Sequence, residues 1–492
     1  MFHSYKVDGY FDEMLEKGKK PRGHCKPFHE KLNEVAPEEL QSRYELAQSD
    51  FLRQGITFTV YSDNEGTERT MPFDFVPKII PPDEWQHLER GLMQRFDALN
   101  AFLDDVYHEQ NILKDGIIPR DLVVNCQHFF EQVAGIDLPR RQHIFMAGID
   151  LIRDDNGEYR VLEDNLRNPS GLSYVFQNRY VMRKVYPEFF NQYSVQSLEQ
   201  QFSYLHSAMA SLAPDDSTSP TIVLLTPGVH NSAYYDHSFI AQRTGIELVE
   251  GRDLVVRERQ VFMKTARGLK KVDVIYRRID DEFLDPLEFR EDSLLGVPGL
   301  IDVYRAGNVS ILNGIGNGVA DDKAIYHFVP DMIRYYLKEE PLVKNVDTYL
   351  LRYDDQLEYV LDHLSELVVK HTNASGGYNM LIGPHATAEE IEAYRAQILK
   401  NPSEFIAQPT IKLSRLPAFK EDRFAACHVD LRVFIFGGEK THVFPGGLTR
   451  VALKEGSLVV NSSQGGGAKD TWVLEENPIV TGGSDNHAKQ SS

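Results

Sequence analysis

The sequence predicts a mixed α/β (α+β) fold with a helical N-terminal region, and three observations indicate it. Apolar residues recur every three or four positions through residues 82–107, which is the period of an amphipathic helix. Short apolar strands alternate with helical segments between residues 221 and 312, and residues 148–165 form two apolar runs around a turn sequence. Because the chain has 492 residues, 42% of them hydrophobic, it can bury more than one core.

Residues 1–130 are predicted to form the helical N-terminal region. A pair of strands is expected between its helices, at residues 55–61 and 72–80. The clearest helix covers residues 82–107, and its apolar face contains Leu88, Leu92, Phe96, Leu99 and Leu103.

The next element is the hairpin of residues 148–165, whose turn contains Asn156-Gly157, a preferred pair for tight hairpins. Side chains alternate along a strand, so Glu163 and Asn165 project from one face, and Asp150 on the partner strand can lie opposite them. Two carboxylates and an amide oxygen suit Mg²⁺, which also leaves coordination positions for phosphate oxygens. The alternative is a solvated hairpin whose acids only face water.

The remaining segments follow in order. Residues 131–212 contain this hairpin and a long helical stretch from 174 to 212, and a polar boundary follows at 213–220. Residues 221–312 are expected to form an α/β domain, residues 313–475 a mixed helix and strand domain, and residues 476–492 a disordered tail. The elements expected in the mixed domain are helices at 322–338 and 354–364 and strands at 367–370, 405–408, 429–436 and 457–461.

Lys370 ends one of these strands and is followed by a loop that contains Gly376 and Gly377. A lysine at a strand end before such a loop can direct an ammonium and backbone N–H groups at phosphates, although the loop has no Walker A spacing. Gln408 lies in a short apolar strand that could offer backbone groups to an adenine edge. An ordinary hairpin with an exposed lysine is the alternative.

Three other basic residues are candidates for binding an anion. Lys323 opens a predicted helix, where it would add a second cation near a phosphate. The glycines that precede it have the spacing G-x-G-x-G, which does not match a dinucleotide fingerprint. Arg432 and Arg450 lie on predicted strands, where a planar guanidinium can clamp a phosphate or carboxylate. Pairing with an acid at the edge of the core is the alternative for both.

Charge and patterning also limit the class of protein. The formal net charge of −20 disfavours sequence-independent binding to nucleic acid or to an anionic membrane surface. The first residues include acids where a signal peptide needs an apolar core, and no run of 18 apolar residues occurs. We therefore expect a cytoplasmic protein without nucleic-acid or membrane partners. The sequence does not indicate an oligomeric state.

In combination, these segments resemble the circularly permuted ATP-grasp family. The matching pieces are Asp150 with Glu163-Asp164-Asn165, the helix start at Lys323, Lys370 with its Gly-rich loop, and Gln408. The metal hairpin normally comes last in an ATP-grasp chain, whereas here it precedes the nucleotide hairpin. The synthetase domain of glutathionylspermidine synthase is similar in this respect. The resemblance extends over residues 130–475.

The resemblance implies an ATP-dependent carboxylate-amine ligase. A small-molecule or peptide carboxylate would become an acylphosphate, and an amine substrate would then displace phosphate to form an amide or peptide-like bond. A nucleotide-binding sensor or scaffold without ligase turnover is the alternative, and a phosphotransferase is a second one. The implied roles are Mg²⁺ binding by Asp150, Glu163 and Asn165, ATP binding by Lys323, Lys370, Gly376, Gly377 and Gln408, and catalysis by Arg167, Arg432 and Arg450.

The chain also departs from the glutathionylspermidine enzymes. Gly148 stands where they have an arginine two residues before the first metal acid, and Arg167 instead follows Asn165 by two residues. An amidase domain with a catalytic cysteine is not evident. These differences disfavour glutathione and spermidine as substrates, while the ligase chemistry is retained.

Overall fold

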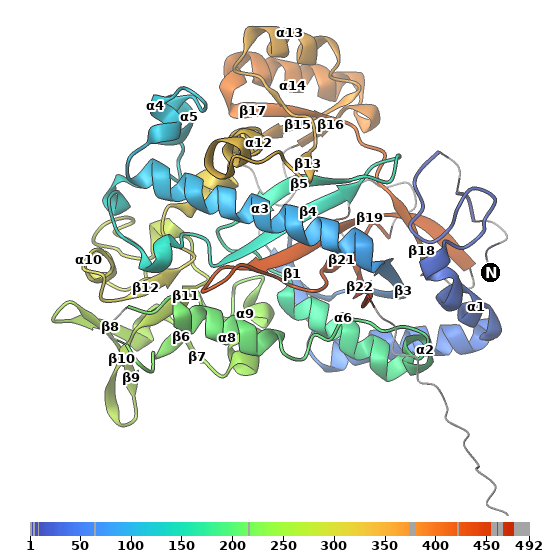
Figure 1. Cartoon of the computed structure of the whole chain (residues 1–492), viewed down its shortest axis with the longest axis horizontal. Coiled ribbons are helices and arrows are strands. Elements are labelled where there is room, and N and C mark those ends of the chain that lie inside the picture. The colour runs from blue at the N-terminus through green and yellow to red at the C-terminus, as the bar shows by residue number, and fades with distance from the viewer. Residues whose placement is uncertain are drawn as a thin grey trace, which may run out of the picture.

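A nine-stranded sheet, called here the large sheet, forms the centre of the molecule (Figure 1). The computed structural model of the chain describes residues 2, 5–7, 9–62, 65–214, 217–372, 380–420, 423–453, 460 and 466–476, with the backbone alone for 57–62 and 65–69. Its architecture is mixed α/β, as the sequence predicts. Across these residues, no helix is both long enough and apolar enough to pass through a bilayer.

The large sheet runs in the order β13-β5-β4-β19-β21-β22-β3, and β18 and β20 also pair with β19. The hairpin that carries the acids, β4–β5, therefore lies inside this sheet and directly beside β19. The bounds are β3 Phe73–Ile80, β4 Met146–Arg153, β5 Tyr159–Asn165, β13 Lys344–Asn345, β18 Arg415–Lys420, β19 Arg423–Phe436, β20 His442–Val443, β21 Leu448–Val451 and β22 Gly467–Val473.

One long helix, α3 (Pro82–Tyr107), crosses the large sheet in Figure 1. The prediction of this helix is confirmed. It begins with a proline at its first position, where no backbone N–H is needed. All five leucine and phenylalanine residues of the predicted face are buried, so the sequence period identifies the side that packs into the core.

The N-terminal region contains strands as well as helices. Helices α1 (Lys26–Glu34) and α2 (Pro37–Arg53) are followed by β1 (Thr57–Ser62), which pairs with β2 (Glu65–Thr70). The two expected strands exist, but the expected pairing is wrong, because β3 instead pairs in parallel with β22 of the large sheet. The polar sequence of β2 shows no apolar alternation, so sequence patterning could not identify the true partner.

Two smaller lobes flank the large sheet in Figure 1. The upper lobe is a sheet of order β14-β17-β15-β16 with its own small apolar core, and the lower lobe has a parallel sheet of order β12-β11-β6-β7. The upper lobe contains β14 Tyr349–Leu350, α13 Asp354–Asp362, β15 Leu367–His371, β16 Met380–Ile382, α14 Ala388–Lys400 and β17 Phe405–Pro409. The lower lobe contains β6 Ile222–Leu225, α9 Tyr234–Thr244, β7 Glu247–Val249, β8 Leu254–Arg257, β9 Gln260–Thr265, β10 Gly268–Val272, β11 Val274–Arg277, α10 Leu300–Arg305 and β12 Ser310–Leu312.

Prolines interrupt both long helices expected from the sequence. The stretch 174–212 is three helices, and Pro187 opens the second of them. The stretch 322–338 is also divided, since a proline at position 330 cannot donate to the carbonyl of Tyr326, where the first helix ends. The helices are α4 Asn111–Lys114, α5 Arg120–Val124, α6 Leu172–Val185, α7 Pro187–Phe190, α8 Gln201–Ser211, α11 Lys323–Tyr326 and α12 Val329–Met332, followed by a π-helical turn at Ile333–Leu337.

Some expectations lie outside the described residues. These are nearly all of the strand expected at 457–461, all of the tail after residue 476, and the loop that contains Gly376 and Gly377.

Candidate active site

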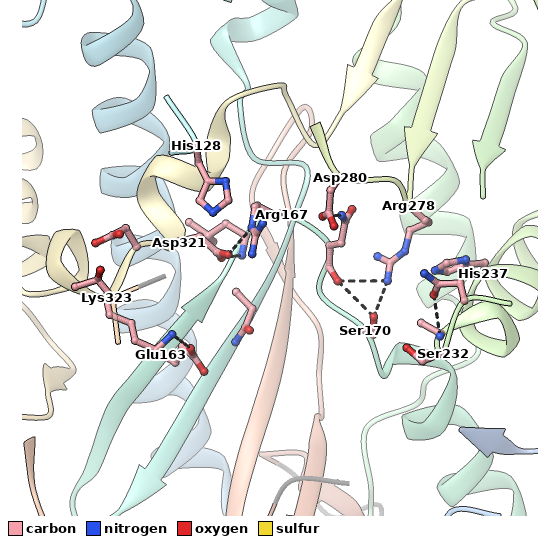
Figure 2. A pocket seen from close by; sticks show the side chains of 17 residues that line it. His128, Glu163, Arg167, Ser170, Ser232, His237, Arg278, Asp280, Asp321 and Lys323 are labelled. Atoms are coloured by element: carbon pink, nitrogen blue, oxygen red, sulfur yellow. Dashed lines mark hydrogen bonds and ion pairs between the residues drawn. The ribbon is translucent and has the colours of Figure 1, made fainter. Parts of the chain in front are cut away.

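A polar cavity of about 380 Å³ lies where the large sheet, the lower lobe and α11 meet. Figure 2 shows Glu163 and Lys323 at one end, Arg167 in the middle, and Ser170, Arg278 and His237 at the other end. The cavity is lined by His128, Glu163, Asn165, Leu166, Arg167, Asn168, Ser170, Asn231, Ser232, Ala233, His237, Arg278, Asp280, Asp321, Asp322, Lys323 and Thr372.

Strand β5 supplies Glu163 and Asn165 to this cavity because alternate residues of a strand face the same side. The register places Asp150 of β4 directly opposite Glu163. The hairpin turn is longer than the two-residue turn suggested by Asn156-Gly157. The backbone N–H of Asp154 donates to the carbonyl oxygen of Glu158 at 3.0 Å, and Gly157 has a φ of 84°, which is the pattern of a three-residue loop ending in a left-handed glycine.

Asp150 is bound by two arginines of neighbouring strands. Nε and Nη2 of Arg432 donate to its two oxygens at 2.6 and 2.8 Å, and Nη2 of Arg450 donates at 2.8 Å. Burial alone would raise the pKa of Asp150, but the two guanidinium groups outweigh burial and lower the pKa to about 2. Gly148 permits this arrangement, since a Cβ there would lie 3.3 Å from Cδ of Arg432 and 2.9 Å from Cβ of Pro169.

Arg450 also binds Asp430, so four charges, three of them buried, alternate across three strands. Its Nε and Nη2 donate to the Asp430 oxygens at 2.9 and 2.5 Å. Asp430 and Arg432 are two residues apart on β19, and they lie opposite Arg450 and Asp150, respectively. Arg432 and Arg450 thus bind sheet acids, as in the second interpretation of the sequence, and neither lines the cavity.

Lys323 is brought to the hairpin by the start of α11. The side chain of Asp322 caps this helix by accepting the backbone N–H groups of Ala324 and Ile325 at 2.7 and 3.3 Å. Nζ of Lys323 then lies 2.9 Å from Oε1 of Glu163. Burial raises the pKa of Glu163, but the lysine more than offsets this and holds the pKa below its ordinary value. Glu163 is therefore an anion at neutral pH.

Lys370 and Gln408 meet in the upper lobe, on adjacent strands β15 and β17. Nζ of Lys370 donates to Oε1 of Gln408 at 2.8 Å, and Nε2 of Gln408 donates to Oγ1 of Thr348 at 3.0 Å. Burial lowers the pKa of Lys370 to about 8, although Glu163 acts in the opposite direction. Lys370 and Gln408 line a narrow cleft of about 10 Å³ against Glu163 and Lys323, which has room for roughly one water molecule.

Arg167 is held at the cavity by one acid. Asp321 accepts Nε of Arg167 at 2.9 Å with one oxygen and the backbone N–H of Leu166 at 2.6 Å with the other. Gly318 leaves room for this side chain, because a Cβ there would lie 2.7 Å from Cδ of Arg167. The two terminal nitrogens of Arg167 make no hydrogen bond to any described residue, so they are available to an anion in the cavity.

Sequence reasoning missed the part of the wall that comes from the lower lobe. Arg278 and Asp280 follow β11, and ligands commonly bind at the carboxyl ends of the strands in a parallel sheet. The charged residues after this strand could therefore have indicated this part of the site. His128 and His237 had no such signal, since each is a lone histidine in the sequence. Burial and, secondarily, Arg278 lower the pKa of His237 to about 2, so this ring is neutral.

The donors at the cavity fit Mg²⁺ held together with phosphates. Glu163 and Asn165 offer hard oxygen atoms, and the buried Nδ2 of Asn165 has no hydrogen-bond partner. In the described part of the chain, no three His, Cys, Asp or Glu side chains group closely enough to hold a metal ion by themselves. A metal here would need oxygen ligands from a substrate, which is how Mg²⁺ commonly binds with nucleotides.

Comparison with known proteins gives one family and several close relatives. The model of the circularly permuted ATP-grasp type 2 family matches residues 77–452. An uncharacterised protein of Synechocystis sp. is 50% identical over 473 residues, which is 96% of this chain and 98% of the relative. An uncharacterised protein of Mycobacterium tuberculosis is 51% identical over 465 residues, which is 94% of this chain and 84% of the relative.

Two further similarities are more limited. A putative glutamate–cysteine ligase of Frankia alni is 39% identical over 476 residues, but this match covers 96% of this chain and only 54% of the relative. The structure of a glutathione synthetase-like effector from Globodera pallida in its apo form has a TM-score of 0.56 at 12% identity, covering 89% of this chain and 98% of that chain. The structural similarity concerns the fold alone.

Proposed function

Because the chain belongs to the circularly permuted ATP-grasp type 2 family, we propose that it is an ATP-dependent carboxylate-amine ligase that works through an acylphosphate. The observation that carries the proposal is the cavity itself. It joins Glu163 and Asn165, two oxygen donors for Mg²⁺, to Lys323 and to Arg167, whose terminal nitrogens can hold an anionic substrate. The ligase name of the Frankia relative adds limited support, since that relative is nearly twice as long.

The reaction proceeds in two displacements. An oxygen of the substrate carboxylate attacks the γ-phosphorus of ATP, and the bond to the bridging oxygen breaks to release ADP. The amine nitrogen then attacks the acyl carbon, the C–N bond forms, and the C–O bond breaks to release phosphate, while the nitrogen loses a proton. Positioning and electrostatic stabilisation account for most of the catalysis in phosphoryl transfer.

Each group has a role in this proposal. Glu163 and Asn165 would hold Mg²⁺, which offsets the phosphate charge when bound. Asp150, the third metal ligand expected from the sequence, is given no metal role in this proposal, because both of its oxygens already accept from guanidinium groups and it does not line the cavity. Lys323 and Lys370 would bind phosphates from the two sides of the narrow cleft. Arg432 and Arg450 act as positioning residues through Asp150.

Nucleotide entry requires the upper lobe to move away from the large sheet. The cleft between Lys370 and Glu163 measures only about 10 Å³. In addition, Gln408, the predicted adenine neighbour, is 3% exposed and already bonded at both ends of its amide. Opening and closing of this lobe would admit ATP and then keep water from the acylphosphate.

A trapping experiment tests the ligase proposal. The full chain is incubated with ATP, Mg²⁺ and hydroxylamine, together with pools of amino acids, dipeptides and dicarboxylates. Hydroxylamine captures an activated acid as a hydroxamate, so we expect ADP and a hydroxamate to form only with the correct pool. Mass spectrometry identifies the acid. ADP at a background rate with every pool, and no hydroxamate, would contradict the proposal and favour a nucleotide-binding protein without turnover.

The proposed role of Lys370 predicts a specific pH dependence. Its pKa is lowered to about 8, so the ammonium is present below that pH and is lost as the pH rises through it. The affinity for a non-hydrolysable ATP analogue with Mg²⁺ should therefore fall by about tenfold or more between pH 7 and 9.5, the scale of one charge-assisted contact. Calorimetry at several pH values measures this.

Lys370→Arg is the matched control, because a guanidinium stays charged throughout this range. Its affinity should change little with pH, whatever its absolute value. A pH profile that is the same for the wild type and Lys370→Arg would show that another group causes the dependence.

A further inference from the structure

Of the described acids that line the cavity, Asp280 alone neither pairs with a base nor caps a helix. Glu163 pairs with Lys323 at 2.9 Å, Asp321 pairs with Arg167 at 2.9 Å, and Asp322 caps α11. Among the described residues, Asp280 forms no ion pair, and its side chain accepts a single hydrogen bond from an amide. It is also exposed. Its carboxylate therefore has lone pairs left to accept from a further donor.

The nearest arginine in the sequence does not neutralise Asp280. Arg278 is 4% exposed, and its terminal nitrogens donate to the carbonyl oxygen of Pro169 and to Oγ of Ser170, both at 2.8 Å. It also lies 3.8 Å from Asp236. This arginine thus fixes the loop that follows β5 and compensates a different acid.

Asn168 supplies a second acceptor next to Asp280. Its Nδ2 donates to Oδ1 of Asp280 at 2.8 Å. A carboxylate can only accept, so the nitrogen of the amide must face Asp280, and the other amide atom is the oxygen. This Oδ1 of Asn168 is buried and has no hydrogen-bond partner. Asp280 and Asn168 together present acceptors for a ligand that donates more than one hydrogen bond.

The position of this pair relative to Arg167 suits the second substrate. Arg167, Asn168 and Asp280 all line the same cavity. Figure 2 shows Asp280 above the space between Arg167 and Arg278, on the lower-lobe side of the cavity. An amine held at Asp280 would therefore share this cavity with an acid held at Arg167.

We propose that Asp280 and the Oδ1 of Asn168 form the subsite for the amine substrate, which binds as a primary ammonium. This inference rests on the proposed function. An ammonium has three N–H donors and a positive charge, which match one carboxylate and one unpaired amide oxygen. The bound nitrogen transfers one proton to water or to a carboxylate before it attacks, so the attacking species is the neutral amine.

Direct binding tests the subsite without any turnover. The full chain with Mg²⁺ and a non-hydrolysable ATP analogue is titrated with ethylamine, alaninamide and 1,4-diaminobutane, and with the alcohols in which hydroxyls replace the amines. We expect at least one amine, but not its alcohol, to bind. Asp280→Asn should lower the affinity for that amine by about tenfold or more, the scale of one charge-assisted hydrogen bond. It should leave the affinity for the ATP analogue unchanged within about twofold.

Two variants separate the charge of Asp280 from other effects. Asp280→Glu keeps the carboxylate and should retain most of the amine affinity. Asp292→Asn removes an exposed acid of the same lobe that pairs with Arg290, outside the cavity, and should change nothing. The proposal is overturned if no probe amine binds the wild type, or if Asp280→Asn binds the amine as tightly as the wild type does.

These outcomes are distinct from failure of the ligase proposal. Hydroxylamine is largely uncharged at neutral pH, so Asp280→Asn should still yield the hydroxamate. If the hydroxamate forms but Asp280→Asn and the wild type bind the amine equally tightly, the subsite is overturned and the ligase proposal is not. Absence of any trapped product in the wild type would instead overturn the ligase proposal, whatever the amine titrations show.

Discussion

Glu163→Gln should lose at least about a hundredfold in ADP formation, the scale seen when one electrostatic stabiliser of a transition state is removed. The substitution keeps the size of the side chain but removes one negative charge from the proposed Mg²⁺ site. The pair with Lys323, now 2.9 Å away, also becomes a weaker hydrogen bond to a neutral oxygen. Steady-state release of ADP in the presence of the correct acid and hydroxylamine measures the loss.

Binding of ATP should survive this substitution. Lys370 and Gln408, the proposed ATP contacts of the upper lobe, remain, so we expect the affinity to stay within about tenfold, or 1.4 kcal/mol. Glu158→Gln is a matched control, because Glu158 lies on the same hairpin with its side chain 60% exposed and does not line the cavity. Normal turnover in Glu163→Gln at saturating substrates would mean that the hairpin is not part of the catalytic site.

Arg450→Met should destabilise the fold by about 3–5 kcal/mol, the cost of leaving a buried charge without its partner. In the wild type, Asp150 and Asp430 are balanced by Arg432 and Arg450. Removal of the Arg450 guanidinium leaves Arg432 paired with Asp150, while the buried Asp430 loses the cation that binds it. The shift in the midpoint of urea unfolding, followed by circular dichroism, measures the effect.

Two comparisons make this result specific. Adding Asp430→Asn to Arg450→Met removes the unpaired charge, so the double variant should recover much of the lost stability. Arg334→Met removes an exposed partner of Asp331, whose side chain is 46% exposed, and should cost less than about 1 kcal/mol. A loss below about 1 kcal/mol for Arg450→Met would show that Arg450 does not compensate the two acids.

The elements that could be predicted from the sequence depend on local patterns. The period of α3, the alternation of Glu163 and Asn165 and the position of Asp150 on the facing strand all follow from the geometry of a single helix or hairpin. The prolines at 187 and 330 are also local signals. Each indicates a break inside one of the two long helices expected at 174–212 and 322–338.

The sequence by itself determined the hairpin of acids, its position in the chain before the hairpin that carries Lys370, and the lysines at the ends of their elements. Only the tertiary structure decided that Arg432 and Arg450 bind Asp150 rather than line the cavity, and that Asp280 and Asn168 complete its far wall. The physical reason is that a charged side chain forms an ion pair with the opposite charge that lies within a few ångströms of it. Between strands and lobes far apart in the chain, packing sets that distance, and no local period encodes it.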